Sequence, residues 1–438
     1  MIARAFFLAT LILICGPASA APAVLPVPAT RPAPKVAPMV APKAAPKAAF
    51  KAAFKPAPAP PMVFYVVKGA ADACGRGCDS WIAAEGQIDS GAAPRFRKFW
   101  AKVRDRKLPI YFSSPGGNLD QALAMGAMLR ERPVVARVAR TVVRECGFEA
   151  QDSDVCVKLK QSGRELHGDL WTRNAMCNSA CPYLILGATT REIAPDALLA
   201  VHSPKVVAHF RGGVPTPQMQ AEANARGRER ADRMIKEYIA RMSVDLGLLV
   251  LARTVKFEDS RVLTREEIDR FGIDRRDLVE TAWTFENVGR SVVHKTALQK
   301  LASDGSFRSS QWRLFCINAD QFELGLQRQS VAQAFLPVVS MSNGEPKPLY
   351  FVSTRAALPG FNYWATRMTK ASVQSLSDLG QFDLTETSQG PDGRRLARSA
   401  KFSSEGLGSA VNTLLATCPA PRSVAGLQTV GAREDAAK

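Results

Sequence analysis

The chain has 438 residues, with 58 Lys and Arg against 40 Asp and Glu, so its formal net charge is +18. This length allows more than one domain, and a hydrophobic content of 46% excludes a wholly disordered chain. Beyond the N-terminal segment no stretch reaches the ~18 apolar residues of a membrane span, so we expect the rest of the chain to be soluble.

The first twenty residues have the pattern of a secretory signal peptide. Arg4 precedes an apolar run from Ala5 to Cys15, and Ala18-Ser19-Ala20 is a small-residue cleavage site. The apolar run is too short to cross a membrane. We therefore expect cleavage after Ala20 and an exported protein, periplasmic or secreted by a bacterium.

Residues 21–61 consist almost entirely of Ala, Pro, Lys and Val. A segment with so much proline and so little to bury is expected to be a disordered tether. The first 61 residues carry seven positive charges and no acid, so adhesion to an anionic envelope surface is an alternative to a plain spacer. Nucleic acid is not an expected partner, because no aromatic-basic module accompanies the charge.

Folded sequence is expected to begin near Met62. Strands are predicted at 63–67 and 81–88, a basic helix at 93–106 and a buried strand at 109–113. Ser114-Pro115-Gly116-Gly117-Asn118 then leads into a helix, and the glycine pair allows a sharp turn that presents a bare backbone amide. This alternation predicts βαβ units and a parallel sheet.

The stretch Cys177-Asn178-Ser179-Ala180-Cys181 precedes the apolar run 182–186. It is typical of a loop entering a buried helix, where free amides favour negative charge. Before the Cys177–Cys181 stretch, one strand is predicted within Pro133 to Val143, and the remaining residues up to Gly168 are predicted to form an insertion. A short strand at 197–201 is followed by His202, an imidazole suited to general base catalysis on a serine.

A long polar helix is predicted at about 216–246, where Glu and Arg alternate. From Phe285 onward the pattern changes to short strands at 311–317, 322–326, 348–353, 363–368 and 382–387, which predicts a smaller β-rich domain. A final helix is expected at 407–415, followed by a loose tail.

Eight cysteines remain after removal of the signal peptide, an even number that favours disulfides in an oxidising compartment. Cys146 with Cys156 and Cys316 with Cys418 are the expected pairs, and Cys74 and Cys78 form either a tight loop or a bridge. Cys177 and Cys181 either bridge each other or pair outside this turn. A zinc site is the alternative, but the chain has four His and no CxxC pair.

Three motifs follow one another in this chain: SPGG before a helix, a serine leading a small-residue helix, and a strand ending in His202-Ser203-Pro204. Their order resembles that of the Clp-type serine peptidases of the crotonase-like fold. The secreted bacterial branch with a C-x-S-A-C nucleophile is the most similar. The resemblance implies an α/β domain of ββα repeats around a parallel sheet at 62–283. A β-rich accessory domain at 284–420 and a tail at 421–438 would follow.

The resemblance also implies roles for individual residues. Ser179 would be the nucleophile, His202 the general base, and the amides of Gly117 and Ala180 the oxyanion hole. The family's carboxylate precedes an Arg-x-Leu-Ser/Thr pattern, present here as Arg261-Val262-Leu263-Thr264. In strict register Ser260 occupies the carboxylate position, so Asp259 is the candidate with a slip of one residue.

Three functions are compatible with this pattern. The first is an exported serine peptidase that cleaves peptide or protein substrates without ATP, since no GxxxxGK[ST] phosphate loop is present. The second is a weak or inactive envelope scaffold of the same fold, and the third is acyl-thioester chemistry, which an exported location disfavours. No cofactor and no metal are expected. The helix at 216–246 is compatible with a homo-oligomer.

Overall fold

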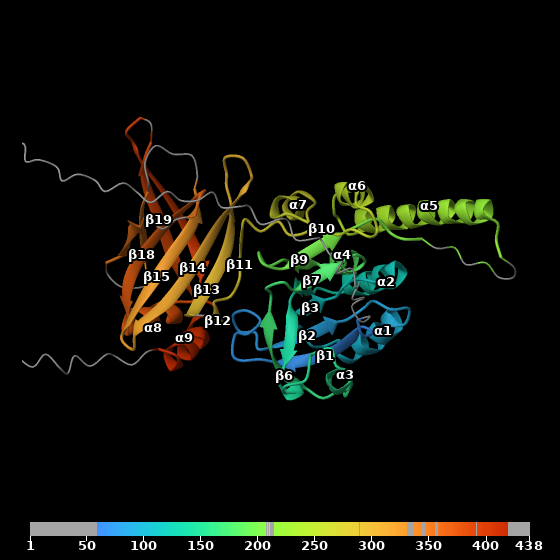
Figure 1. The fold of residues 1–438 in the computed structure, drawn as a ribbon, viewed down its shortest axis with the longest axis horizontal. Coiled ribbons are helices and arrows are strands. Elements are labelled where there is room, and N and C mark those ends of the chain that lie inside the picture. The colour runs from blue at the N-terminus through green and yellow to red at the C-terminus, as the bar shows by residue number, and fades with distance from the viewer. Residues whose placement is uncertain are drawn as a thin grey trace, which may run out of the picture. The chain divides into compact units, whose positions relative to one another are not determined.

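The computed structural model describes residues 59–418, except 207, 209, 211–213, 289, 331–336, 343–346, 355–357 and 391. The predicted signal peptide, almost all of the predicted tether and the predicted tail at 421–438 lie outside these residues. The described chain forms a mixed α/β sheet domain followed by an antiparallel β domain (Figure 1). None of its described helices is long and apolar enough to cross a bilayer.

A seven-stranded sheet forms the centre of the α/β domain, with the strand order β5-β6-β1-β2-β3-β4-β8. The prediction of a parallel sheet is correct for β2, β3, β4 and β8, and for the pair β6 and β1. It is wrong for β1 with β2 and for β5 with β6, which are antiparallel. Only residues 69–79 join β1 to β2, too few for the crossover that a parallel pair needs. The strands are β1 (Val63–Lys68), β2 (Ser80–Glu85), β3 (Ile110–Ser113), β4 (Val135–Val138), β5 (Arg140–Val143), β6 (Leu166–Trp171) and β8 (Thr190–Glu192).

Alternation along β1 shows how the two faces of the sheet are covered. Val63, Tyr65 and Val67 belong to one buried cluster, with Cys156 of α3, whereas Phe64 packs against the opposite cluster with Phe96 of α1. The predicted single strand at 133–143 is divided into β4 and β5. The helices of this domain are α1 (Ala92–Lys102), α2 (Leu119–Arg130), α3 (Asp154–Lys160), α4 (Cys181–Leu186), α5 (Pro217–Arg241), α6 (Gly247–Thr254) and α7 (Arg265–Arg270), with a 3-10 turn at Arg144–Cys146.

A second, three-stranded sheet leads into Ser179 and His202, the two residues expected to act in catalysis. Its order is β10 (Arg261–Val262), β9 (Leu198–Val201) and β7 (Met176–Asn178). β7 and β9 are parallel, with Asn178 opposite Ala200. Ser179 and His202 therefore follow the carboxyl ends of two neighbouring parallel strands.

The described residues form four disulfides, which are the pairs Cys74–Cys78, Cys146–Cys156, Cys177–Cys181 and Cys316–Cys418. They include the two expected pairs, and both open alternatives are resolved in favour of a bridge, between Cys74 and Cys78 and between Cys177 and Cys181. The Cα atoms of Cys177 and Cys181 are 5.1 Å apart. Four disulfides in one chain fit an extracytoplasmic, oxidising compartment.

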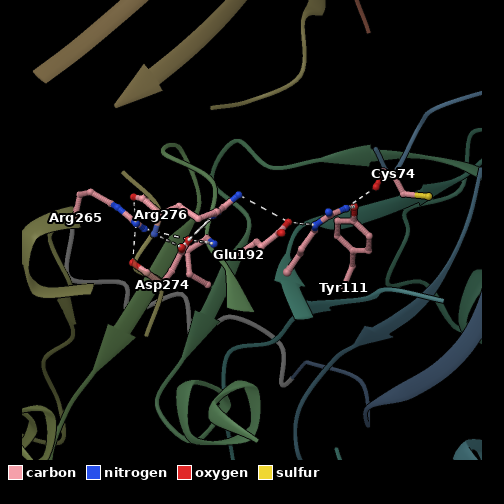
Figure 2. A network of polar contacts seen from close by, with 8 residues as sticks. Cys74, Tyr111, Glu192, Arg265, Asp274 and Arg276 are labelled. Atoms are coloured by element: carbon pink, nitrogen blue, oxygen red, sulfur yellow. Dashed lines mark hydrogen bonds and ion pairs between the residues drawn. The ribbon is translucent and has the colours of Figure 1, made fainter. Parts of the chain in front are cut away.

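A chain of ion pairs, buried at Asp274 and Arg265, fixes the segment that follows α7 (Figure 2). Asp274 is 3% exposed, accepts hydrogen bonds from Arg276 at 2.7 Å and from the Ile193 N–H at 2.8 Å, and lies 3.1 Å from Arg265. The network continues from Arg276 through Glu192 of β8 to Arg137 of β4. Arg137 in turn binds the Tyr111 hydroxyl and the Cys74 carbonyl. Burial alone would raise the pKa of the Asp274 carboxyl, but the Arg276 hydrogen bond and the charges of Arg276 and Arg265 hold it below the usual value.

The β domain contains one ten-stranded sheet that curls into a nearly closed antiparallel barrel (Figure 1). Four of the five predicted strands are longer in the structure; β14 has 12 residues, which pair with β13 over Phe307–Leu314 and with β15 over Ser310–Asn318. Two long strands, β13 and β20, and helix α8 were not predicted. The elements are β11 (Leu278–Glu280), β12 (Thr284–Val288), β13 (Arg290–Lys300), β14 (Phe307–Asn318), β15 (Gln321–Gln329), β16 (Val338–Ser342), β17 (Leu349–Thr354), β18 (Phe361–Thr369), α8 (Lys370–Asp378), β19 (Gln381–Gln389), β20 (Arg395–Ser403) and α9 (Leu407–Ala416).

Candidate active site

Ser179 occupies an unusual backbone conformation between β7 and α4. Its φ is +60°, in the left-handed region that non-glycine residues seldom adopt and that costs about 1–3 kcal/mol. Two constraints hold the turn: the Ser179 N–H donates to the Ala200 carbonyl at 2.9 Å, and the Cys177–Cys181 disulfide closes the turn around it. A strained serine between a strand and a helix is the arrangement that exposes a nucleophilic hydroxyl in hydrolases.

The SPGG loop lies directly against this turn. The Asn178 N–H donates to the Ser114 carbonyl at 3.0 Å, and the Ser114 N–H donates to the Met176 carbonyl at 2.7 Å. Gly116 and Gly117 have φ values of +101° and +138°. A Cβ on Gly116 would lie 2.5 Å from the Ser179 Cβ, and a Cβ on Gly117 would lie 2.3 Å from the Ile88 carbonyl oxygen. Both positions therefore require glycine.

Two backbone N–H groups of this region have no acceptor. Neither the Gly117 N–H nor the Ala180 N–H donates a hydrogen bond to any residue that the structure describes, although the neighbouring amides of Asn118 and Ser179 do. Both residues line the same cavity as Ser179. Free amides beside a serine hydroxyl suit the binding of an oxyanion.

His202 follows the end of β9, as the sequence predicts, and its ring is oriented by the backbone. Its Nδ1 lies 2.8 Å from the carbonyl oxygen of Ser203. Since a carbonyl can only accept, Nδ1 carries the proton and Nε2 keeps its lone pair, the form of imidazole that accepts a proton. Phe257 packs edge-on against the ring, with ring centroids 5.1 Å apart.

Ser179, His202, Gly117 and Ala180 open onto one cavity of about 580 Å³. In the described residues no hydrogen bond joins the Ser179 hydroxyl to the His202 ring. Such bonds are often long without substrate and tighten only in the complex. The structure thus brings four of the five sequence-predicted site residues to a common cavity.

Asp259 is placed differently. It is exposed in the turn after α6, where its N–H donates to the Lys256 carbonyl at 3.1 Å, and it does not line the cavity. Its carboxylate makes no hydrogen bond to His202, whose Nδ1 is bound to the Ser203 carbonyl. Glu258 and Ser260 are exposed as well.

The walls of the cavity include residues that sequence reasoning did not select. Helix α5 contributes Arg230, Met234 and Ile235, and the loop after His202 contributes Lys205. Tyr183 is 3% exposed, and its hydroxyl has no hydrogen-bond partner in the described chain. Burial, and secondly the charge of Asp232, raise the pKa of the Tyr183 hydroxyl to about 12. The alternating Glu and Arg of this region predicted a helix, but they did not show what the helix covers.

No cluster of three or more His, Cys, Asp or Glu side chains in the described ranges is arranged to hold a metal ion. Neither the protein-family models nor the curated proteins gave a match to this chain.

Two solved structures are similar to parts of the chain. One is a membrane-bound stomatin-specific protease, with 16% identity and a TM-score of 0.26 over 44% of this chain and 75% of that chain. The other is invasion associated protein B from Bartonella henselae, with 15% identity and a TM-score of 0.24 over 32% of this chain and 97% of that chain. The chain thus has distant structural similarity to a protease over part of its length. With TM-scores this low, neither structure indicates a function for this chain.

Proposed function

We propose that the protein is an exported serine hydrolase that cleaves peptide bonds without ATP. The observation that carries this proposal is the left-handed turn at Ser179, which faces the same cavity as His202 and the two free amides. The Ser179 Oγ attacks the substrate carbonyl while the His202 Nε2 accepts its proton. The N–H groups of Gly117 and Ala180 bind the oxyanion, each contributing about 3–4 kcal/mol to the lowering of the barrier.

The second half of the reaction uses the same groups. The protonated His202 returns its proton to the leaving amine, the peptide amine departs, and the acyl group remains on Ser179 Oγ. Water then attacks the acyl carbonyl while His202 accepts its proton. The bond between the acyl carbon and Ser179 Oγ breaks, His202 returns the proton to Oγ, and the acid product leaves. The Ser203 carbonyl fixes the tautomer of the ring, but stabilises the imidazolium less than a carboxylate would. Asp259 is our candidate for a carboxylate that replaces this carbonyl during the reaction.

We further propose that the α/β domain is a Clp-type peptidase domain of the crotonase-like fold. The parallel order of β2, β3 and β4, with α1 and α2 between them, and the glycine pair after β3 support this assignment. A catalytically inactive envelope scaffold of the same fold is the alternative. Two observations favour it: the Ser179 hydroxyl makes no bond to His202 within the described chain, and Asp259 is exposed. A homo-oligomer remains a proposal, to be tested by sedimentation.

Labelling with a fluorophosphonate probe separates the two functions. We expect the wild type to be labelled, Ser179→Ala to lose the label, and His202→Ala to be labelled at least 100-fold more slowly, since it lacks the general base. Ser203→Ala is the matched control, because it removes a neighbouring serine hydroxyl but keeps the carbonyl that orients the ring. A folded wild type that takes up no label would exclude the hydrolase and support the scaffold. Cleavage of unfolded protein substrates without ATP would establish the peptide-bond specificity.

A further inference from the structure

The solvent face of helix α1 concentrates positive charge. Its inward face is apolar and buried through Ala92, Phe96 and Trp100, so the other face is left to solvent. Residues 92–108 contain seven basic side chains and a single acidic one. All seven are exposed, and they are Arg95, Arg97, Lys98, Lys102, Arg104, Arg106 and Lys107.

Few of these cations have a partner within the protein. Arg95 pairs with Asp89, and Arg106 lies 3.6 Å from Glu165. The other five form no ion pair with any residue in the described ranges. Cations held within a few turns of one another repel, and an external anionic surface relieves that repulsion.

The first described residues contact α1. The Arg95 guanidinium donates to the carbonyl oxygen of Met62 at 3.0 Å, which fixes the start of the domain against α1. Residues 21–61, immediately before it, carry six Lys or Arg and no Asp or Glu.

We propose that the exposed cations of α1 and of the residues directly after it dock the protein onto an anionic phospholipid bilayer. The apolar face of α1 is already used in the core, so the helix lies on the headgroups and does not insert. Docking then depends on charge alone, and each Lys or Arg near an anionic bilayer strengthens binding about fivefold. Screening by salt weakens it, because the Debye length is about 8 Å at physiological ionic strength.

Cosedimentation with vesicles tests this surface in the full mature chain. The probes are vesicles of phosphatidylglycerol mixed with phosphatidylcholine and vesicles of phosphatidylcholine alone. The triple variant Arg97→Gln, Lys98→Gln, Lys102→Gln is expected to bind the anionic vesicles about 100-fold more weakly than the wild type. The control variant Arg226→Gln, Arg228→Gln, Arg233→Gln removes three exposed cations from α5 and is expected to bind nearly as well as the wild type.

Several outcomes would overturn the proposal. If the triple variant of α1 binds the anionic vesicles as tightly as the wild type, docking belongs to the tether. If both variants lose the same affinity, only net charge matters. Binding to dextran sulfate without binding to anionic vesicles would indicate a soluble or cell-wall polymer as the partner. If the triple variant does not fold, the pair Arg104→Gln, Lys107→Gln, which lies beyond the end of α1, tests the same face with an expected loss of about 25-fold.

Discussion

Replacement of Gly116 by alanine tests whether the close contact between the SPGG loop and the Ser179 turn is needed for catalysis. The new Cβ would meet the Ser179 Cβ at 2.5 Å and the Asn178 carbonyl oxygen at 2.6 Å, so the turn must move. The φ of +101° adds strain of about 1–3 kcal/mol, and the overpacking adds about 1–3 kcal/mol. We therefore expect the free energy of unfolding to fall by about 2–6 kcal/mol.

Activity is expected to fall even under conditions in which the variant remains folded. A displacement of the nucleophile by about 1 Å costs about 100-fold in rate, or about 2.7 kcal/mol of barrier. Fluorophosphonate labelling rates, measured below the melting temperature, give this value directly. Gly77→Ala is the matched control: its φ is +74°, but no heavy atom lies within 4 Å of the added Cβ. Labelling of a folded Gly116→Ala variant at the wild-type rate would refute the assigned geometry.

Three further predictions concern the network, the disulfide and Asp259. Asp274→Asn is expected to lower the free energy of unfolding by about 3–5 kcal/mol at pH 7, because it leaves Arg265 without its ion-pair partner. Folding lowers the pKa of Asp274, so the stability difference between wild type and variant, measured by urea titration, should vanish as the pH falls through that pKa. The double variant Cys177→Ala, Cys181→Ala should be labelled at least tenfold more slowly than the wild type, whereas Cys74→Ala, Cys78→Ala should be labelled at the wild-type rate. Equal labelling rates for the two double variants would mean that the Cys177–Cys181 disulfide is not needed to hold the Ser179 turn. Asp259→Asn should be labelled about 100-fold more slowly if the Asp259 carboxylate replaces the Ser203 carbonyl at the His202 ring during the reaction, as proposed, and a rate within about threefold of the wild type would leave the orientation of His202 to the Ser203 carbonyl alone.

Local sequence patterns predicted the elements that carry the site. The apolar strands before Ser179 and His202 and the glycine pair after β3 have strong periodicity and turn chemistry, so their positions could be inferred along the chain. That these residues share a cavity followed from a general property, since the carboxyl ends of parallel strands meet at one edge.

Other features depend on contacts that single positions do not reveal. The ring of His202 is held by a backbone carbonyl, and every residue has one. The antiparallel pairing of β1 with β2 depends on the length of the connection, not on the strand sequences. In the β domain, seven of the 11 residues of β13 are polar, and Lys295 is buried on the same side as Val293 and Ala297, so the apolar alternation was too weak to predict this strand.

The Cys177–Cys181 bridge turns Ser179 into a member of a small covalent ring. Such a ring closes only where thiols are oxidised. If the chain is exported as proposed, a newly made copy in a reducing cytoplasm has this ring open and the serine turn free to relax from its left-handed conformation. The chain would then acquire hydrolytic activity only after it has left the cell interior, and proteins of the cytoplasm would not be cleaved.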